Sequence, residues 1–538
     1  MSDPVESSSG RSGCALVLGI LLIATGVLFL AQNLFDYSLF RFFRIAVIVF
    51  ADYWPVLLVI WGLLKIYQRF SEPSRARASA FEMVLLILII VSGLTLRAAR
   101  GVMDDVSNEM SFDQIAEIAG IPMLGAPVHR FSEERRFELG SSDGILVVNP
   151  GGNVKITGNE STAVEVVATK RIHHHSESEA SRIAGSVELE FEGSGARPRL
   201  SVVLPEERVS VQIDLDIRLP KSAGVSIENR RGRVEVFDIA GPVEIETSHE
   251  GIEARNLTGG LRAETRHGDI RIDGVSGSVE LLTRNGSITA ERVDGDLRAE
   301  ASHGGIRVED VSGRALLDNR HADVRVARVQ GPIEVNAQNS DVSVVSAGAS
   351  VSIKTSHAPV FVRDVFGSLT IEASNAAIQA RDVRGDVMVD DQDEAVTLVA
   401  IGGSVRLRAP RSEVAVEDIE GPVDIESSHD DVRVAGFGSS LAIRSTHAEL
   451  RVETARLSGN VNVSTTYGDV ELRVPPSTPM TFQGRTEDGA LRSTIAGLDL
   501  REERRDGGTS WSGAVMGGGP QVLVVTSFGD IVLEAGEP

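Results

Sequence analysis

Between residues 226 and 470, apolar and polar positions repeat with a period of 18 residues. Counted from His267 as position zero, apolar side chains stand at positions 3, 5, 8, 12 and 14, and a glycine stands at position 10. Residues two apart share one face of a strand, so positions 3 and 5 predict one short strand and positions 12 and 14 a second. The polar residues between them are expected to face water.

A turn residue marks the start of each repeat, 13 times without a slip. Such a fixed period is typical of a solenoid, in which each repeat stacks only on its neighbours. Two strands and two turns per repeat leave no room for a helix, so we expect parallel β-coils. At about 4.8 Å per coil they make a rod of roughly 60 Å. The column reads Arg231, His249, His267, Asn285, His303, His321, Asn339, His357, Asn375, Asp393, Arg411, His429 and His447.

This pattern predicts an all-β solenoid, a single-stranded right-handed parallel β-helix, because parallel connections strongly favour the right hand. The pattern weakens at both ends, as capping requires. Residues 136–225 are therefore assigned to an N-terminal cap with the first strands, 226–470 to the regular array, and 471–538 to C-terminal coils and a cap. Near the end, Thr466–Asp469 and Ser527–Asp530 repeat the turn motif out of phase.

Residues 1–97 belong to another physical class, in which apolar runs replace the repeat. The runs are Ala15–Leu30, Ile45–Leu64 and Met83–Leu96. The first two reach the length that spans a bilayer, about 20 residues with their flanks. We expect an α-helical membrane domain with about three transmembrane helices; two helices and an interfacial helix are the alternative. Residues 98–135 are expected to be a linker.

Charge sets the expected topology and excludes one class of partner. With three transmembrane helices, the N-terminus and the second loop lie on one side of the membrane and carry five basic residues near it, whereas the other side carries four. Because basic residues favour the cytoplasmic side, this balance favours an inner-membrane protein with an extracytoplasmic solenoid. Residues 1–100 carry nine basic and six acidic side chains, and the remainder carries 44 basic and 70 acidic. Such an acidic surface repels nucleic acid. The only cysteine, Cys14, excludes an intrachain disulfide and a thiolate metal cluster.

Seven of the eleven histidines lie in the turn column, and three pairs occupy successive coils. Backbones about 5 Å apart would let two imidazoles share a metal or titrate together near pH 6. Turn geometry is the favoured interpretation, because Asn replaces His within the column and both residues tolerate left-handed backbone. The paired histidines, which are the metal candidates of the column, are His249, His267, His303, His321, His429 and His447.

A second cluster, His173, His174 and His175, precedes Glu177 and Glu179 in a polar segment. Adjacent loop residues do not converge into a closed four-ligand site, so we interpret the cluster as a solvated loop and predict neither metal nor cofactor. Parallel β-coils also occur in polysaccharide lyases and hydrolases. The aspartates that follow the turns stand in single file, however, whereas glycoside hydrolysis needs a converging carboxylate pair. We therefore predict no enzymatic activity.

The stretch from Val209 to Thr265 resembles the bacterial putative-adhesin family of β-strand repeat proteins. Its opening motif, Ile-x-Leu-Pro-Lys, stands at Ile217 to Lys221, and His often replaces the family's Asn in the repeats that follow. Gly519 to Leu533 is similar to that family's ending. The resemblance covers about residues 135–535, and it implies a right-handed β-helix without known catalytic residues.

The membrane segment resembles, more loosely, the small hydrophobic domain of LiaF-type cell-wall-stress proteins, through LGILLIATGVLFLAQNL at 18–34 and through Trp54–Leu64. This resemblance implies an envelope context. The predicted function is a non-enzymatic, membrane-anchored scaffold or binding rod, adhesin-like, for a glycan, an envelope protein or itself. The alternatives are an envelope-stress sensor or regulator and, more distantly, a polysaccharide-active enzyme.

Overall fold

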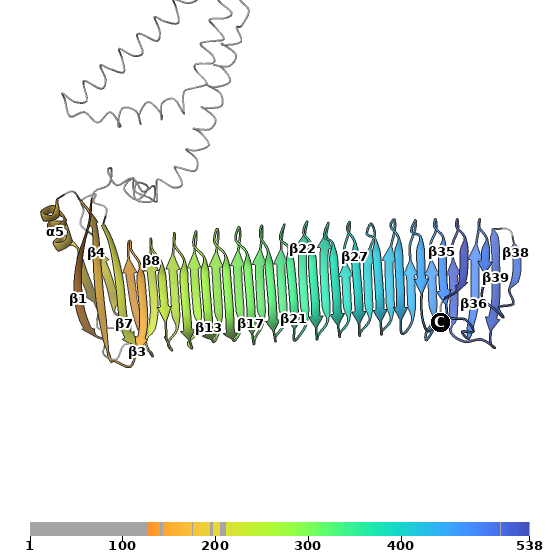
Figure 1. Ribbon diagram of the computed structural model, residues 1–538, viewed down its shortest axis with the longest axis horizontal. Coiled ribbons are helices and arrows are strands. Elements are labelled where there is room, and N and C mark those ends of the chain that lie inside the picture. The colour runs from red at the N-terminus through yellow and green to blue at the C-terminus, as the bar shows by residue number, and fades with distance from the viewer. Residues whose placement is uncertain are drawn as a thin grey trace, which may run out of the picture. The chain divides into compact units, whose positions relative to one another are not determined.

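The computed structural model describes residues 127–139, 144–174, 176–193, 197–204, 211–505 and 507–536. Residues 127–538 form one compact unit, and its described strands wind into an all-β solenoid (Figure 1). Each coil contributes one strand to sheet A and one to sheet B. The predicted solenoid is thereby confirmed, while the hand of the coil stays a prediction.

Neighbouring coils pair in parallel, 18 residues apart along most of the array and 20 residues apart at the last step, where Leu450 lies opposite Val470. In sheet A, Ile270 lies opposite both Ile252 and Ile288. In sheet B, Leu281 lies opposite both Ala263 and Ala299. The array strands of sheet A are β9 Val234–Phe237, β11 Ile252–Leu257, β13 Ile270–Ser276, β15 Ile288–Asp294, β17 Ile306–Val311, β19 Val324–Val329, β21 Val342–Ala347, β23 Val360–Val365, β25 Ile378–Val383, β27 Val396–Ile401, β29 Val414–Ile419, β31 Val432–Phe437, β33 Leu450–Glu453 and β35 Val470–Val474. Those of sheet B are β8 Gly224–Asn229, β10 Val243–Thr247, β12 Leu261–Thr265, β14 Val279–Thr283, β16 Leu297–Ala301, β18 Ala315–Asn319, β20 Ile333–Ala337, β22 Val351–Ser356, β24 Leu369–Ser374, β26 Val387–Asp390, β28 Val405–Ala409, β30 Val423–Ser427, β32 Leu441–Arg444 and β34 Val461–Ser464.

The five predicted inward positions form the core between the sheets. In one coil they are Val324, Val326, Val329, Ile333 and Val335, all of them buried. Burying one such side chain contributes about 1.5–3 kcal/mol. Because each coil repeats the same five positions, the core is a set of continuous apolar columns along the solenoid.

A sixth inward column, at position 16, is mostly polar and was not predicted. The Thr283 hydroxyl donates to the carbonyl oxygen of Gly268 over 3.2 Å, and the Asn319 amide donates to that of Gly304 over 2.8 Å. These bonds satisfy backbone groups beside the histidine turn. Thr, Ser and Asn also suit exposed turns, so the residue types alone did not reveal burial. The buried polar members are Asn229, Thr247, Thr265, Thr283, Asn319, Thr355, Asp391 and Ser427, and Ala301, Ala337, Ala373 and Ala409 fill the places between them.

Asp391 is the one carboxylate in this described column, and burial raises the pKa of its carboxyl. A raised pKa in the folded state means that ionisation costs folding free energy, so stability falls as pH rises from about 4 through the raised value. We expect Asp391→Asn to raise the melting temperature at pH 7 and to have little effect near pH 4. The exposed neighbour Asp390→Asn is the matched control. A gain that is equal at both pH values would contradict this account.

Long antiparallel strands close the N-terminal end. Strand β1 pairs antiparallel with β4, and β4 pairs antiparallel with β7. Helix α5 packs Ala180, Ile183 and Ala184 against Ile172. Strand β1 begins within the predicted linker, so that prediction is wrong for residues 128–135. The elements are β1 Val128–Glu138, β2 Gly144–Asn149, β3 Val154–Asn159, β4 Ala163–His173, α5 Glu177–Ser186, β5 Glu188–Glu192, β6 Arg199–Val203 and β7 Val211–Pro220.

Lys170 joins three elements of this cap. Its buried ammonium donates to the carbonyl oxygens of Ala184 and Val187, over 2.9 and 2.8 Å, at the end of α5. It also forms a 2.8 Å ion pair with Glu133 of β1. The hydrogen bond from Lys170 holds the pKa of the Glu133 carboxyl below its ordinary value. Lys170 therefore links the helix, β4 and β1 in addition to their strand pairing and apolar packing.

The C-terminal end departs from the order of the sequence. Strand β40 lies between β34 and β36, and β41 lies between β35 and β37. Strands β36 and β37 come earlier in the sequence than β40 and β41, yet they lie further out. The later pair, β40 and β41, lies between them and the last strands of the array. The out-of-phase turn motifs meet here, since Tyr467 bridges Phe528. The strands are β36 Met480–Thr486, β37 Leu491–Ser493, β38 Arg501–Arg505, β39 Gly508–Val515, β40 Gln521–Val525 and β41 Ile531–Ala535.

The predicted transmembrane runs, Ala15–Leu30, Ile45–Leu64 and Met83–Leu96, lie outside the described residues, as does the linker up to residue 126. Within the described part of the chain, no helix has both the length and the apolar character needed to cross a membrane.

Candidate functional site

The paired turn histidines stack in space as the repeat requires. The ring centroids of His249 and His267 are 5.3 Å apart, and their planes differ by 12°. The other pairs lie at similar distances: His303 and His321 are 5.2 Å apart with planes tilted by 35°, and the last two histidines of the column are 5.1 Å apart with planes at 15°. The column therefore carries three separate pairs of neighbouring rings along one edge of the solenoid.

Left-handed backbone does not explain these histidines, contrary to the sequence-based interpretation. Among the described non-glycine residues of the turn column, only Asn339, His357 and Asn375 have positive φ values. Instead, the imidazole Nδ1 of His267 lies 3.1 Å from the carbonyl oxygen of Ser248. A carbonyl oxygen only accepts, so in this geometry Nδ1 carries a hydrogen and donates it to Ser248. Histidine is thus held by a bond to the preceding coil.

At the C-terminal end the last pair continues into two other rings. His447 stacks on His429 at 5.1 Å and on Tyr467 at 4.9 Å, and Tyr467 stacks on Phe528 at 5.1 Å. Tyr467 and Phe528 are 49% and 47% exposed. The four rings fill equivalent turn positions, so the motifs that looked out of phase in the sequence are in phase in the fold.

The second histidine cluster lies at the end of β4. His173 ends β4, His174 follows it, and His175 lies outside the described residues. Glu177 and Glu179 begin helix α5, which replaces the predicted loop. Across the described ranges, no group of three or more His, Cys, Asp and Glu residues is arranged to hold a metal.

The other turn of each coil carries a feature that sequence reasoning missed. Position 7 has left-handed backbone in twelve successive coils, with φ from 52° at Arg292 to 69° at Gly274. Asp, Asn and Gly, which tolerate this conformation best, are frequent there, and this frequency was the available signal. The column is Asp238, Asn256, Gly274, Arg292, Asp310, Arg328, Ser346, Asp364, Asp382, Ala400, Asp418 and Gly436.

A groove follows this edge of the solenoid. One section has a volume of about 1240 Å³ and reaches Ser458, and a second of about 550 Å³ begins at Arg292. Both sections are lined by Ser346 and Phe366, so they form one channel, hereafter the edge groove. Its length covers more than eight coils of the array.

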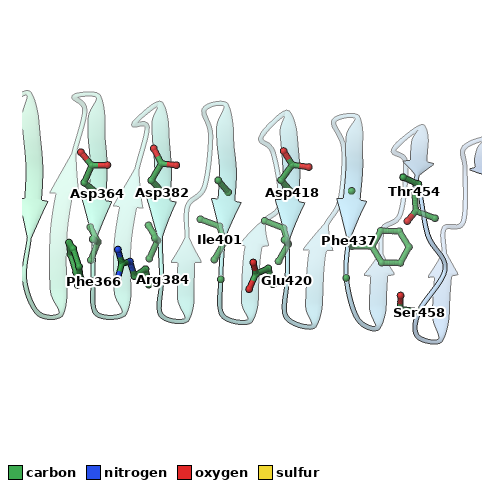
Figure 2. A pocket seen from close by; sticks show the side chains of 18 of the residues that line it. Asp364, Phe366, Asp382, Arg384, Ile401, Asp418, Glu420, Phe437, Thr454 and Ser458 are labelled. Carbon is green, nitrogen blue, oxygen red and sulfur yellow. The ribbon is translucent and has the colours of Figure 1, made fainter. Parts of the chain in front are cut away.

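Two rows of side chains line the larger section. Asp364, Asp382 and Asp418 point the same way in one row (Figure 2). Because they lie on separate coils and do not face one another, they lack the geometry of a carboxylate pair converging on one bond. The second row consists of Phe366, Arg384 and Glu420 (Figure 2).

Small residues create a notch in the middle of this section. Ala400 and Gly402 take the places that carry longer side chains in the coils on either side, where Arg384 and Glu420 stand in the second row. A Cβ at Gly402 would lie 2.9 Å from the carbonyl oxygen of Arg384, so a larger residue here would press against the backbone of the preceding coil.

Charge in the groove is partly neutralised. Asp364 lies 3.3 Å from Arg363, and the guanidinium of Arg384 lies 4.0 Å from the centre of the Phe366 ring. In the smaller section, a hydrogen bond from Arg328 holds the pKa of an aspartate at position 7, Asp310, below its ordinary value. Asp382 and Asp418, by contrast, have no ion pair or side-chain hydrogen bond within the described part of the chain. These two carboxylates are available to an outside group.

Two family models match the chain. Residues 324–534 match the one described as Toastrack DUF4097, and residues 17–106 match the one described as the LiaF transmembrane domain. These matches confirm the sequence-based resemblance to a β-strand repeat family with a LiaF-type membrane domain. The second match indicates membrane association. No curated protein matches the chain.

One solved structure is similar to the chain, a putative cell adhesion protein from Clostridium sporogenes. The alignment covers 76% of this chain and 100% of that chain, at 10% sequence identity and a TM-score of 0.18. At that TM-score the similarity supports no conclusion on fold or function.

Proposed function

We propose that this LiaF-type, Toastrack-containing chain is a non-enzymatic, membrane-anchored binding rod, with its right-handed solenoid on the extracytoplasmic side. The edge groove is the observation that carries the proposal. It is open, spans many coils, and offers unpaired carboxylates beside the small residues Ala400 and Gly402. Such a surface suits an elongated envelope polymer, either a glycan strand or an extended protein segment, more than an enclosed small molecule.

Binding through the edge groove should depend on its free carboxylates. In co-sedimentation of the full-length protein in detergent with isolated cell walls, we expect Asp382→Lys with Asp418→Lys to weaken binding at least tenfold. Both residues lie at the surface, and Arg292 and Arg328 already hold the same left-handed backbone with long basic side chains, so the solenoid should remain folded. The matched control, Glu334→Lys with Glu417→Lys, makes the same charge change on outward strand faces. Equal binding by both variants would exclude the groove as the site.

The side of the membrane is tested independently by protease accessibility. We expect protease to cut the solenoid in spheroplasts and to leave it intact in sealed inverted membrane vesicles. Cleavage in inverted vesicles with protection in spheroplasts would place the solenoid in the cytoplasm and end the scaffold proposal.

A second candidate, an envelope-stress sensor or regulator, is favoured by the LiaF match over residues 17–106. In that case, substitutions within the matched membrane segment should change expression of envelope-stress genes, while the groove variant should leave that expression unchanged. If the protein is a scaffold, the groove variant should instead weaken cell-wall binding, and substitutions in the membrane segment should leave that binding unchanged.

A further inference from the structure

Strand β1 is the outermost strand at the N-terminal end of the solenoid (Figure 1). It runs for 11 residues, and among the described strands it pairs with β4 alone. A long strand paired on one side presents free N–H and C=O groups, which form a template for another strand. The side chains of β1 decide which strand can pair with this edge.

We propose that β1 pairs antiparallel with β1 of a second copy of this chain, about a two-fold axis at Glu134, so that sheet A continues from one protein into the other. Residues opposite each other in a sheet must lie on the same face, which limits the possible registers to steps of two. Glu134 then stands opposite its own copy. This self-association is independent of the partner bound in the edge groove.

The residues of β1 complement one another about that axis. Glu133 stands opposite Arg135 of the copy, and Arg130 stands opposite Glu138 of the copy, each twice by symmetry. Phe131 stands opposite Phe137. Opposite charges and aromatic pairs on facing positions stabilise a sheet, whereas like charges destabilise it.

The neighbouring registers are less complementary. A shift of two residues in one direction places Arg130 opposite Arg136. A shift in the other direction pairs Glu134 with Arg136, but it places Arg135 opposite its own copy and loses the Arg130–Glu138 and Phe131–Phe137 pairs. The proposed register has a single unfavourable contact, between the two Glu134 carboxylates on the axis. That contact is exposed to solvent, which weakens its repulsion.

The inner face of β1 is already ordered for such pairing. Glu133 is held by Lys170 over 2.8 Å and by Arg135 over 2.6 Å, and Phe137 stacks on Phe191 with ring centroids 4.4 Å apart. Little side-chain freedom would be lost on that face when the copy docks. Arg130 and Glu138, on the outer face, are exposed and can be changed without disturbing the cap.

The pair of Arg130 and Glu138 gives a decisive test. Eight residues separate them along one strand, about 27 Å, so they cannot contact each other within one chain. We expect Arg130→Glu and Glu138→Arg each to raise the dimer dissociation constant of the full chain in detergent about fivefold or more, measured by light scattering after size exclusion. The double variant Arg130→Glu with Glu138→Arg should restore the wild-type value. Singles without effect, or a double variant weaker than either single, would overturn the proposal.

Disulfide trapping separates this contact from any association through the membrane segment. In a Cys14→Ser background, Glu134→Cys should form a disulfide-linked dimer on mild oxidation, because the two residues face each other on the axis. The matched control Glu138→Cys faces Arg130 and should stay monomeric on a denaturing gel. Equal cross-linking of both variants, or of neither, would overturn the register. Cell-wall binding by the same variants should be unchanged, so failure of this contact and failure of the edge groove are distinguishable.

Discussion

Replacing Leu317 by Asp is expected to break the solenoid, whereas replacing its neighbour Leu316 by Asp should leave it folded. Leu317 is fully buried in an inward column of β18, and Leu316 lies half-buried on the outward face of the same strand. A carboxylate without a partner at the inward position costs several kcal/mol, and the lost apolar burial adds about 1.5–3 kcal/mol. The two variants have the same composition, so only the face of the strand differs.

Because each coil contacts only its neighbours, the damage at Leu317 should separate the solenoid into two parts. Thermal unfolding followed by circular dichroism should show a first transition lowered by roughly 10 °C or more. Limited proteolysis of the folded protein should open near β18. The Leu316→Asp control should melt within a few degrees of the wild type. Equal melting of the two variants would mean that the inward assignment of this column is wrong.

Removing residues 520–538 should destabilise the C-terminal end far more than its length suggests. The truncation deletes β40 and β41, which supply the parallel partners of β34 and β35 on one side and of β36 and β37 on the other. Each of these four strands loses its neighbour on one side, and the exposed edges should promote aggregation. We expect early proteolysis of residues 475–519 and loss of the monodisperse species in size exclusion.

An internal deletion is the matched comparison for that truncation. Removing residues 478–519 leaves a connection of four residues between β35 and β40, similar to the connections inside the array. The inserted strands would then follow β34 and β35 as an ordinary next coil. We expect this longer deletion to keep more β-sheet and a higher melting temperature than the truncation. The reverse order would contradict the inserted arrangement of β40 and β41.

The sequence predicted the parts of the fold that rest on apolar periodicity. Val324 and Val326 at positions 3 and 5 have one physical interpretation in a short strand, and repetition made it unambiguous. The polar residues had no such single interpretation, because Thr283 in the core and Asp382 in the groove belong to types that also suit exposed turns. The notch at Gly402 depends on what the coils before and after it carry, so it exists only in three dimensions.

The C-terminal insertion escaped prediction for a different reason. The register between Val470 and Ile531 spans 61 residues instead of 18, and no local pattern records such a jump. The repeated motifs at Tyr467 and Phe528 were the visible trace of it, and their stacking at 5.1 Å explains why they resemble each other.

The inserted strands also bear on how the chain is assembled during translation. In most of the array the ribosome delivers each coil directly onto the one before it, so folding can follow synthesis. That sequence of events stops at β35, because its sheet partner β41 is made only after the outer strands β36–β39. The outer strands must therefore wait unpaired on one side, or move aside, until the later pair has emerged. Completion of this end of the solenoid thereby reports that synthesis has passed β41.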